Sequence, residues 1–341
     1  MRELLTRRQA IQGVAAAGLA GLAARPGAAA DDFFNGKTVN IICGYNPGGG
    51  VDVGTRLIGR HLARFIPGEV KTVVRNMQGA SGLVSANHMF VRAQPDGLTL
   101  AVPGRNWILK PLLGIKNATF DPTKFGYVGS TGGTNSVAWI RADLGIRTPA
   151  EFKASPRKIL FGGLVQSTLL AWGPKLLSDI GLPVQVIMGY DNTSRVILAI
   201  EQKELDAIYT ADTSLTHRRD LVDNKVIIPV FQSAPWKPGV PLIEELVPPE
   251  HQALMQLVHG SATFGMPLIA PPGTPADRLQ TLRKAFADMT KDKAFQEDAK
   301  KVGEPYEAPI EGEALAGVVR KLVESVTPAA AAALKDLTGE G

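Results

Sequence analysis

The chain has 341 residues, of which 45% are hydrophobic and 20% charged, an ordinary globular composition that argues against a disordered or low-complexity protein. At about 150 residues per domain, the length favours two domains. The single cysteine, Cys43, excludes an intramolecular disulfide and a thiolate metal cluster, and its apolar surroundings predict a small buried residue.

The first 30 residues have the pattern of a secretory signal peptide. Arg7 and Arg8 precede a weakly apolar stretch at residues 10–24, and residues 28–30 form an A-x-A cleavage site. The paired arginines favour the twin-arginine route, although the Sec route stays open because Ala10 stands where an aromatic residue is usual. Cleavage near Ala30/Asp31 would release a periplasmic protein, and no later stretch predicts a membrane-spanning helix.

The formal net charge of +5 comes mostly from this signal. The first 30 residues carry four arginines against one glutamate, so their removal takes the net charge from +5 to +2. The high isoelectric point therefore does not indicate a nucleic-acid partner.

Strands and helices are predicted to alternate along residues 31–136. Apolar runs predict strands, a three-glycine loop separates the first strand from a helix at 52–66, and a second helix opens at residue 79. On the first helix Arg56, Arg60 and Arg64 form a stripe that we interpret as a solvated face, although it could contact an anion. The predicted strands are 39–43, 70–74, 98–102 and 127–130.

The pattern restarts at residue 137 and returns to its beginning near residue 263. Helices are predicted at 167–180 and 193–202, and further helices follow Thr274 and Thr327. We therefore expect an α/β protein with residues 31–136 in lobe 1, residues 137–262 in lobe 2, and residues 263–341 returning to lobe 1. The predicted strands are 137–141, 158–161, 184–188, 205–209, 226–231 and 264–270.

Each lobe opens with a strand, a glycine-rich turn and a helix. The first N–H groups of a helix have no intrahelical partner, and the helix dipole adds partial positive charge there. Two such helix starts facing each other across a cleft would bind an anion, carboxylates included.

Several loops offer candidate ligand contacts, each with a structural alternative as a turn, a cap or a core residue. Glycines allow close approach of the backbone, arginines grip carboxylates, and tryptophan packs against apolar ligand faces. Asp52 could also cap its helix or bond back to the loop before it. The candidates from the residues alone are Pro47, Gly48, Gly49, Asp52, Arg105, Asn106, Trp107, Tyr190, Arg195 and Asp212.

Signals for catalysis are weak. The five histidines do not pair with one another or with Cys43 at metal-ligand spacing, and no G-x-S-x-G, P-loop or dinucleotide-binding motif occurs. We expect no enzyme, cofactor or metal, with an exported enzyme as the alternative because the twin-arginine route often carries oxidoreductases.

Six short motifs follow one another along the chain. They are Lys37-x-Val39-x-Ile41-Ile42, Pro47-Gly48-Gly49-Gly50-x-Asp52, Val74-x-Asn76-x-x-Gly79-Ala80-x-Gly82, Pro95-Asp96-Gly97-x-Thr99-Leu100, Gly189-Tyr190 and Pro271-Pro272-Gly273-Thr274-Pro275. This ordered set resembles the Bug-type periplasmic receptors of tripartite tricarboxylate transporters, and the likeness spans about residues 36–325.

The resemblance implies a type II periplasmic-binding fold and a monomer that passes a small organic acid to membrane subunits. It also implies that loops after the first strand of each lobe hold one ligand carboxylate. Carried over, these residues are Pro47, Gly48, Gly49 and Asp52 in lobe 1 and Gly162, Gly163 and Tyr190 in lobe 2. A signalling role for the same fold remains an alternative.

Two loops depart from the family pattern. Lobe 2 has no histidine after its glycines, where Gln166 and Ser167 follow instead, and Arg105-Asn106-Trp107 replaces a Ser/Thr-rich loop. An arginine beside a tryptophan would suit a larger or aromatic organic acid.

Overall fold

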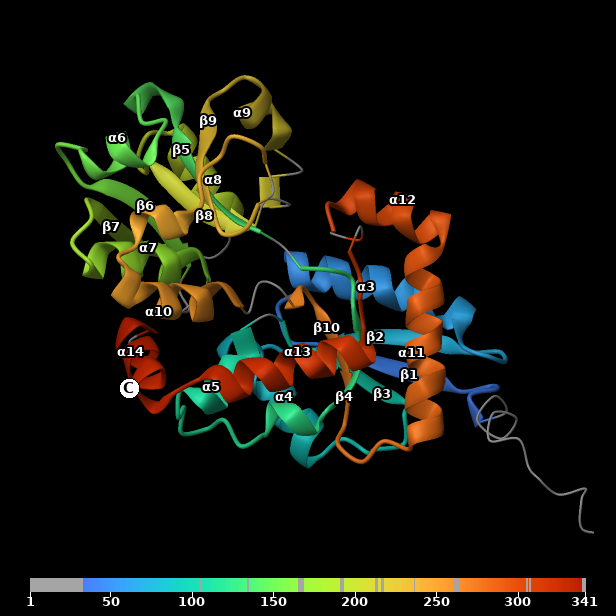
Figure 1. Cartoon of the computed structure of the whole chain (residues 1–341). Coiled ribbons are helices and arrows are strands. Elements are labelled where there is room, and N and C mark those ends of the chain that lie inside the picture. Colours follow the sequence, from blue (N-terminus) through green and yellow to red (C-terminus); the bar gives the residue numbers. More distant parts are fainter. Residues whose placement is uncertain are drawn as a thin grey trace, which may run out of the picture.

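The computed structural model shows two α/β lobes, as the alternation of strands and helices predicts (Figure 1). It describes residues 33–338 except 105, 134, 165–168, 191–192, 212–213, 216–217, 236, 261–263, 305 and 307. The predicted signal peptide lies outside the described residues. Among those described, no helix is both long and apolar enough to cross a membrane.

Lobe 1 is built on a six-stranded mixed sheet in the order β11-β4-β10-β3-β1-β2. β1 runs parallel to β2 and β3, while β10 is antiparallel to β3 and β4. The carboxyl ends of β1 to β4 therefore lie at one edge of the sheet. The strands are β1 (Thr38–Cys43), β2 (Lys71–Asn76), β3 (Thr99–Val102), β4 (Gly126–Ser130), β10 (Pro267–Ala270) and β11 (Ile310–Glu311).

Helices cover both faces of this sheet because both faces of its central strands are apolar. One core packs α3, α11 and α12 on alternate strand residues such as Ile41, and the other packs α4 and α13 around Ile42. The helices are α3 (Gly50–Leu62), α4 (Leu83–Val91), α5 (Leu109–Leu112), α11 (Ala276–Lys291), α12 (Lys293–Val302) and α13 (Gly312–Ser325).

The arginine stripe along α3 and the turn after it is solvent-exposed, as predicted, and its side chains form surface ion pairs. Arg60 pairs with Asp298 of α12 and Arg64 with Asp292, which precedes α12, while Arg56 pairs with Asp52. The stripe therefore ties α3 to α12 and to its own first turn, although surface pairs of this kind contribute little energy individually.

Lobe 2 has a five-stranded sheet in the order β7-β6-β8-β5-β9. β6 runs parallel to β7 and β8, and β5 is antiparallel to β8 and β9. The strands are β5 (Ser136–Arg141), β6 (Ile159–Leu164), β7 (Val184–Tyr190), β8 (Ala207–Ala211) and β9 (Ile227–Gln232). Its helices are α6 (Pro149–Lys153), α7 (Leu169–Asp179), α8 (Thr193–Glu201), α9 (Arg219–Asp223), α10 (Pro249–Gly260) and α14 (Pro328–Thr338).

Gly162 and Gly163 lie inside β6 and do not form the predicted glycine turn. A methyl group on Gly162 would come within 2.4 Å of Val196 on α8, and one on Gly163 within 2.4 Å of Met188 on β7. The two glycines therefore allow close packing on both sides of the strand. In the sequence, such a pair of glycines cannot be distinguished from a turn.

The carboxyl edges of the two sheets meet where the chain crosses between lobes. β4 ends at Ser130 on the edge of sheet 1 where β10 begins, and β5 starts at Ser136, opposite the carboxyl end of β8. The chain between Ser130 and Ser136 can span about 20 Å at most, so the two sheet edges lie close to each other.

The C-terminal helix differs from the predicted assignment of residues 263–341 to lobe 1. α13 packs on β4 of lobe 1, whereas α14 packs against α7 and α10 of lobe 2 (Figure 1). Leu334 and Leu337 are buried there in the core that contains Trp172. The same core includes Leu109 and Leu113 from the α5 region, so apolar packing is continuous between the lobes on this side.

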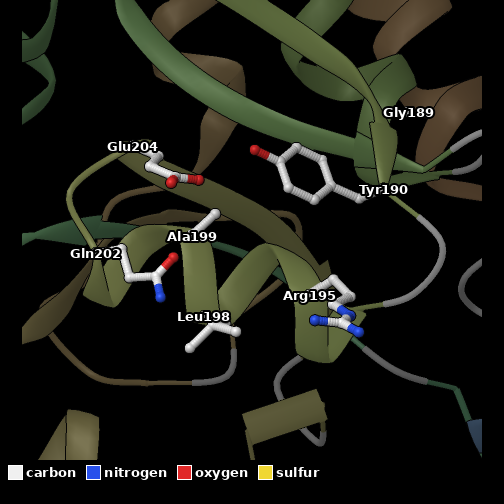
Figure 2. A pocket seen from close by; sticks show the side chains of 7 residues that line it. All are labelled: Gly189, Tyr190, Arg195, Leu198, Ala199, Gln202 and Glu204. Carbon is white, nitrogen blue, oxygen red and sulfur yellow. The ribbon is translucent and has the colours of Figure 1, made fainter.

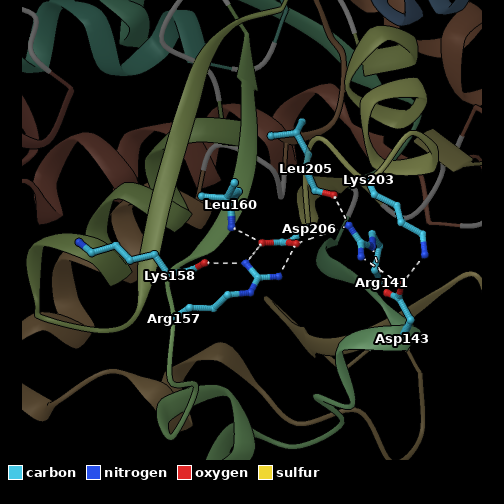
Figure 3. A network of polar contacts seen from close by, with 8 residues as sticks. All are labelled: Arg141, Asp143, Arg157, Lys158, Leu160, Lys203, Leu205 and Asp206. Carbon is cyan, nitrogen blue, oxygen red and sulfur yellow. Dashed lines mark hydrogen bonds and ion pairs between the residues drawn. The ribbon is translucent and has the colours of Figure 1, made fainter.

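A polar network closes the opposite edge of sheet 2, away from lobe 1 (Figure 3). The buried carboxylate of Asp206 accepts two hydrogen bonds from Arg157, at 2.6 and 2.9 Å, and one from the N–H of Leu160 at 2.9 Å. Burial alone would raise the pKa of Asp206, but the bonds from Arg157 and Leu160 outweigh it and hold the pKa below its usual range.

We expect Asp206→Asn to lower the free energy of unfolding by about 2 kcal/mol, because charge-assisted bonds to a buried carboxylate are lost. Arg157 is half exposed and can return to water, which limits the loss. Urea unfolding at pH 7 measures the change. Asp179→Asn, at an exposed pair with Lys175, is the control and should stay within about 0.5 kcal/mol of wild type. Equal effects in the two variants would contradict this account.

Candidate ligand-binding site

The start of α3 lies at the carboxyl edge of sheet 1. Pro47, Gly48 and Gly49 are exposed on the loop between β1 and this helix. Gly49 is the N-cap residue and supplies no capping side chain, and the first helical bond runs from the N–H of Val53 to the carbonyl of Gly49. The N–H groups of Gly50, Val51 and Asp52 therefore precede the first intrahelical donor, as expected for a helix start that can hold an anion.

Asp52 holds this loop in place through hydrogen bonds to its carboxylate. The residue is only 2% exposed, and its carboxylate accepts hydrogen bonds from the N–H of Gly48 and the guanidinium of Arg56, both at 2.9 Å. The side-chain amide of Asn76, at the end of β2, donates to the same carboxylate at 2.7 Å and to the carbonyl of Tyr45 at 2.9 Å. Asp52 thus bonds back to the loop, one of the two roles that its position predicted.

The protonation state of Asp52 follows from these bonds. Burial alone would raise the pKa of its carboxyl group, but the bonds from Arg56, Gly48 and Asn76 outweigh that cost and lower the pKa below its usual range. The carboxylate is therefore ionised at neutral pH. It supports the loop through several donors and presents little surface to a ligand.

A left-handed turn lines the same edge. Gly79, Ala80, Ser81 and Gly82 all have positive φ, and Ser81 is buried. A side chain on Gly82 would collide with the carbonyl of Pro103, since its Cβ would lie 1.8 Å from that oxygen. The loops after β2 and β3 therefore touch, backbone against backbone, and non-glycine residues with positive φ are a form of strain typical of functional sites.

Trp107 does not line a cleft. Its side chain is 0% exposed and lies in the core of lobe 1, where its ring centroid is 5.2 Å from those of Phe120 and Phe125. Of the two alternatives that the sequence left open for Trp107, a ligand contact and a core position, the structure shows the core position, where the apolar ring is buried among aromatic residues. Asn106 begins a short helical turn with Trp107, and Arg105 lies outside the described residues.

Lobe 2 carries an open pocket of about 240 Å³ beside α8. Tyr190 at the end of β7 and Arg195 in the first turn of α8 both line it, so the structure brings these two predicted residues together. Figure 2 shows the Tyr190 hydroxyl and the Glu204 carboxylate pointing toward one another, with Arg195 at the other end. Burial, and then the charge of Glu204, raise the pKa of Tyr190, which keeps its hydroxyl protonated as a donor.

The predicted site residues are therefore divided between the two lobes. The loop at Pro47–Gly49 belongs to lobe 1, whereas every residue that lines the α8 pocket belongs to lobe 2. Gln166, Ser167 and Asp212 lie outside the described residues. Asn76 and Arg56 were not predicted as site residues, although Asn76 stands in one of the family-like motifs and at the end of a strand, and Arg56 lies four residues after Asp52, at ion-pair spacing on a helix. Within the described residues, no three His, Cys, Asp or Glu side chains gather as a metal site would require.

Comparison with known proteins places the fold. No family model matches the sequence. The UPF0065 protein in the gbd 5′ region of Cupriavidus necator is 32% identical over 167 residues, which are 46% of this chain and 49% of that protein. The chain thus matches about half the length of this curated relative.

Solved structures match over nearly the whole chain. A TctC solute-binding protein from Polaromonas is 17% identical, with a TM-score of 0.64 over 90% of this chain and 99% of that one. The chain has the fold of the TctC/Bug solute-binding proteins. The periplasmic binding protein BugD gives 20% identity and a TM-score of 0.62 over 90% and 99% of the two chains. MatC from Rhodopseudomonas palustris, with bound malate, gives 19% and 0.60 over 89% and 100%. The predicted resemblance and the type II periplasmic-binding fold are confirmed.

We expect Asp52→Asn to lower the free energy of unfolding by about 2 kcal/mol at pH 7, because a neutral amide cannot replace the charge-assisted bonds to Gly48, Arg56 and Asn76. The pKa of Asp52 is lowered in the folded protein, so its stabilisation is complete above the unfolded value of about 4 and is lost as the pH falls through the folded pKa. The gap between variant and wild type should therefore narrow only below about pH 4. Urea unfolding from pH 7 to pH 2 measures it.

Arg56→Gln is the companion variant, because it removes one donor and leaves the carboxylate bound by Gly48 and Asn76. Its loss of stability should be smaller than that of Asp52→Asn. A gap for Asp52→Asn that is constant across the whole pH range would contradict the assigned pKa shift.

Proposed function

We propose that the protein is a periplasmic solute-binding receptor that captures a small organic acid and delivers it to a tripartite tricarboxylate-type membrane transporter. The signal-like first 30 residues support export, and the shared fold supports solute binding. In this proposal the chain is a monomeric, non-catalytic binding protein without a cofactor, and it contacts the membrane only through its transporter partner.

The observation that carries this proposal is the uncapped start of α3 at the junction of the two sheet edges. N–H groups at a helix start bind a carboxylate through short hydrogen bonds and the helix dipole, and need no cationic side chain. The bond that Gly48 donates to Asp52 and the bond that Asn76 donates to Tyr45 hold the loop in place before the ligand arrives, so little ordering is required on binding.

We propose that one ligand carboxylate binds at Gly48–Gly50 and that lobe 2 contributes through the segments after β6 and β7. Tyr190 and Arg195 supply a hydroxyl donor and a cation at that end of lobe 2. Because Trp107 is buried in the core, it offers no surface for an aromatic ring. The proposal therefore favours a small aliphatic di- or tricarboxylate, and MatC with its bound malate supports this class.

We expect at least one member of a panel of malate, succinate, adipate, citrate and benzoate to raise the melting temperature, because a ligand that binds only the folded state stabilises it. At 100 times its Kd, a ligand adds about 2.7 kcal/mol. Differential scanning fluorimetry measures the shift, and the matching amides, such as succinamide, are the controls. The absence of a shift with every carboxylate would count against an organic-acid receptor.

We expect Gly50→Pro to weaken binding of the best carboxylate by about tenfold while leaving the fold intact. Proline suits the first helical position, and Gly49 already has the extended backbone that proline requires of its predecessor. The substitution removes one N–H donor from the proposed site. Gly50→Ala keeps this donor and should bind like wild type in calorimetry. Equal affinities for the two variants would show that this N–H does not contact the ligand.

A further inference from the structure

Glu304 is a buried carboxylate that the ligand site does not use. It follows α12, where Gly303 takes a left-handed conformation with φ +70° and the N–H of Glu304 donates to the carbonyl of Ala299 at 2.9 Å. This turn directs the chain inward, and Glu304 is only 7% exposed. A charged group is rarely buried unless it is paired, so its contacts indicate what it does.

The first contact of Glu304 is with the crossover between the lobes. The hydroxyl of Thr131, which follows β4 directly and is fully buried, donates to Oε1 of Glu304 at 3.0 Å. The neighbouring hydroxyl of Ser130 donates to the carbonyl of Phe264 on the return crossover. A Cβ on Gly265 would lie 1.6 Å from the carbonyl oxygen of Gly132, so the two crossovers are in direct contact.

The second contact of Glu304 is with the helix that carries the proposed ligand site. A Cβ on Gly54 of α3 would lie 2.8 Å from Oε2 of Glu304 and 2.8 Å from the Cε of Met266, which precedes β10. Because residue 54 has no side chain, the carboxylate and the return crossover both lie against α3. The rest of α12 is held to α3 by the bond between Asp298 and His61 at 3.1 Å.

We propose that Glu304 is a positioning residue that couples α3 to the crossovers and so restricts the relative motion of the lobes. The carboxylate touches the ligand helix with one oxygen and a crossover hydroxyl with the other. A shift of α3 relative to the crossover would strain or break the bond that Thr131 donates to this buried carboxylate, and losing a donor to a buried charge is costly. An effect of this restriction on ligand affinity rests on the proposed function, whereas the restriction of lobe motion itself does not.

The test uses the full mature chain with spin labels at Arg92→Cys in lobe 1 and Asp223→Cys in lobe 2, both exposed positions. The native Cys43 is buried. Pulsed electron–electron double resonance then gives the distribution of distances between the two labels, and so between the lobes, without ligand. We expect Thr131→Val to broaden this distribution and Thr131→Ser, which keeps the hydroxyl, to restore the wild-type width.

Thr290→Val is the matched control. Thr290 is also buried, and its hydroxyl donates to the carbonyl of Ala287 within α11, away from the crossovers. The Thr290→Val variant should be less stable than wild type, but the width of its distance distribution should not change. If Thr131→Val does not fold, Glu304→Gln takes its place and should broaden the distribution by less, because a neutral acceptor binds the hydroxyl more weakly than a carboxylate does. A wild-type width in folded Thr131→Val, or in folded Glu304→Gln where that variant takes its place, overturns the proposal.

A second readout connects the contact to ligand capture. With the best carboxylate of the panel, Thr131→Val should raise the Kd about tenfold in calorimetry, because binding must then order lobes that are less restricted. Thr290→Val should stay within about twofold of wild type. If no carboxylate binds wild type, the proposed function fails while the width measurement still decides the role of Glu304. If Thr131→Val broadens the distance distribution but leaves the Kd unchanged, Glu304 restricts lobe motion without affecting ligand capture, and only that second part of the proposal is overturned.

Discussion

The carboxylate of Asp52 holds together the parts of lobe 1 on which ligand binding would depend. It joins the loop before α3, the first turn of that helix and the end of β2 through donors from three places in the chain. Each of these donors would otherwise face water or lie unpaired. The loop can therefore expose its own N–H groups to a ligand without collapsing onto them, and the site is arranged before binding.

The negative charge of Asp52 lies close to the proposed anion site, but it is paired. Arg56 lies beside Asp52 and balances its charge, and the guanidinium also donates to Asn76 at 2.9 Å. The partial positive charge at the start of α3 then remains available to a bound acid. A ligand carboxylate would meet backbone dipoles of fixed direction, which discriminate by shape and distance more than a mobile lysine would.

Much of the fold could be predicted because hydrophobic runs and helical spacing carry it. Every strand of the two sheets except the two-residue β11 follows the sequence pattern closely, including the return near residue 267. The role of Gly162 and Gly163 could not be predicted, since glycines that permit close packing and glycines that permit a turn look alike in one sequence. Trp107 was equally ambiguous, because the aromatic partners that bury it, Phe120 and Phe125, come from a different segment. The lobe to which α14 docks depends on tertiary packing that no local pattern encodes.

The placement of α14 gives the protein a third connection between its lobes. Besides the two crossovers, the chain passes from α13 on lobe 1 to α14 on lobe 2 at Val326 and Thr327. The two crossovers touch each other at Gly132 and Gly265, so together with the α13–α14 link they join the lobes at two separate places. Two separate attachments resist twisting of one lobe against the other more than bending about the line between them. The described chain also starts in lobe 1, at Phe33, and ends in lobe 2, so the separation of its two ends follows the angle between the lobes.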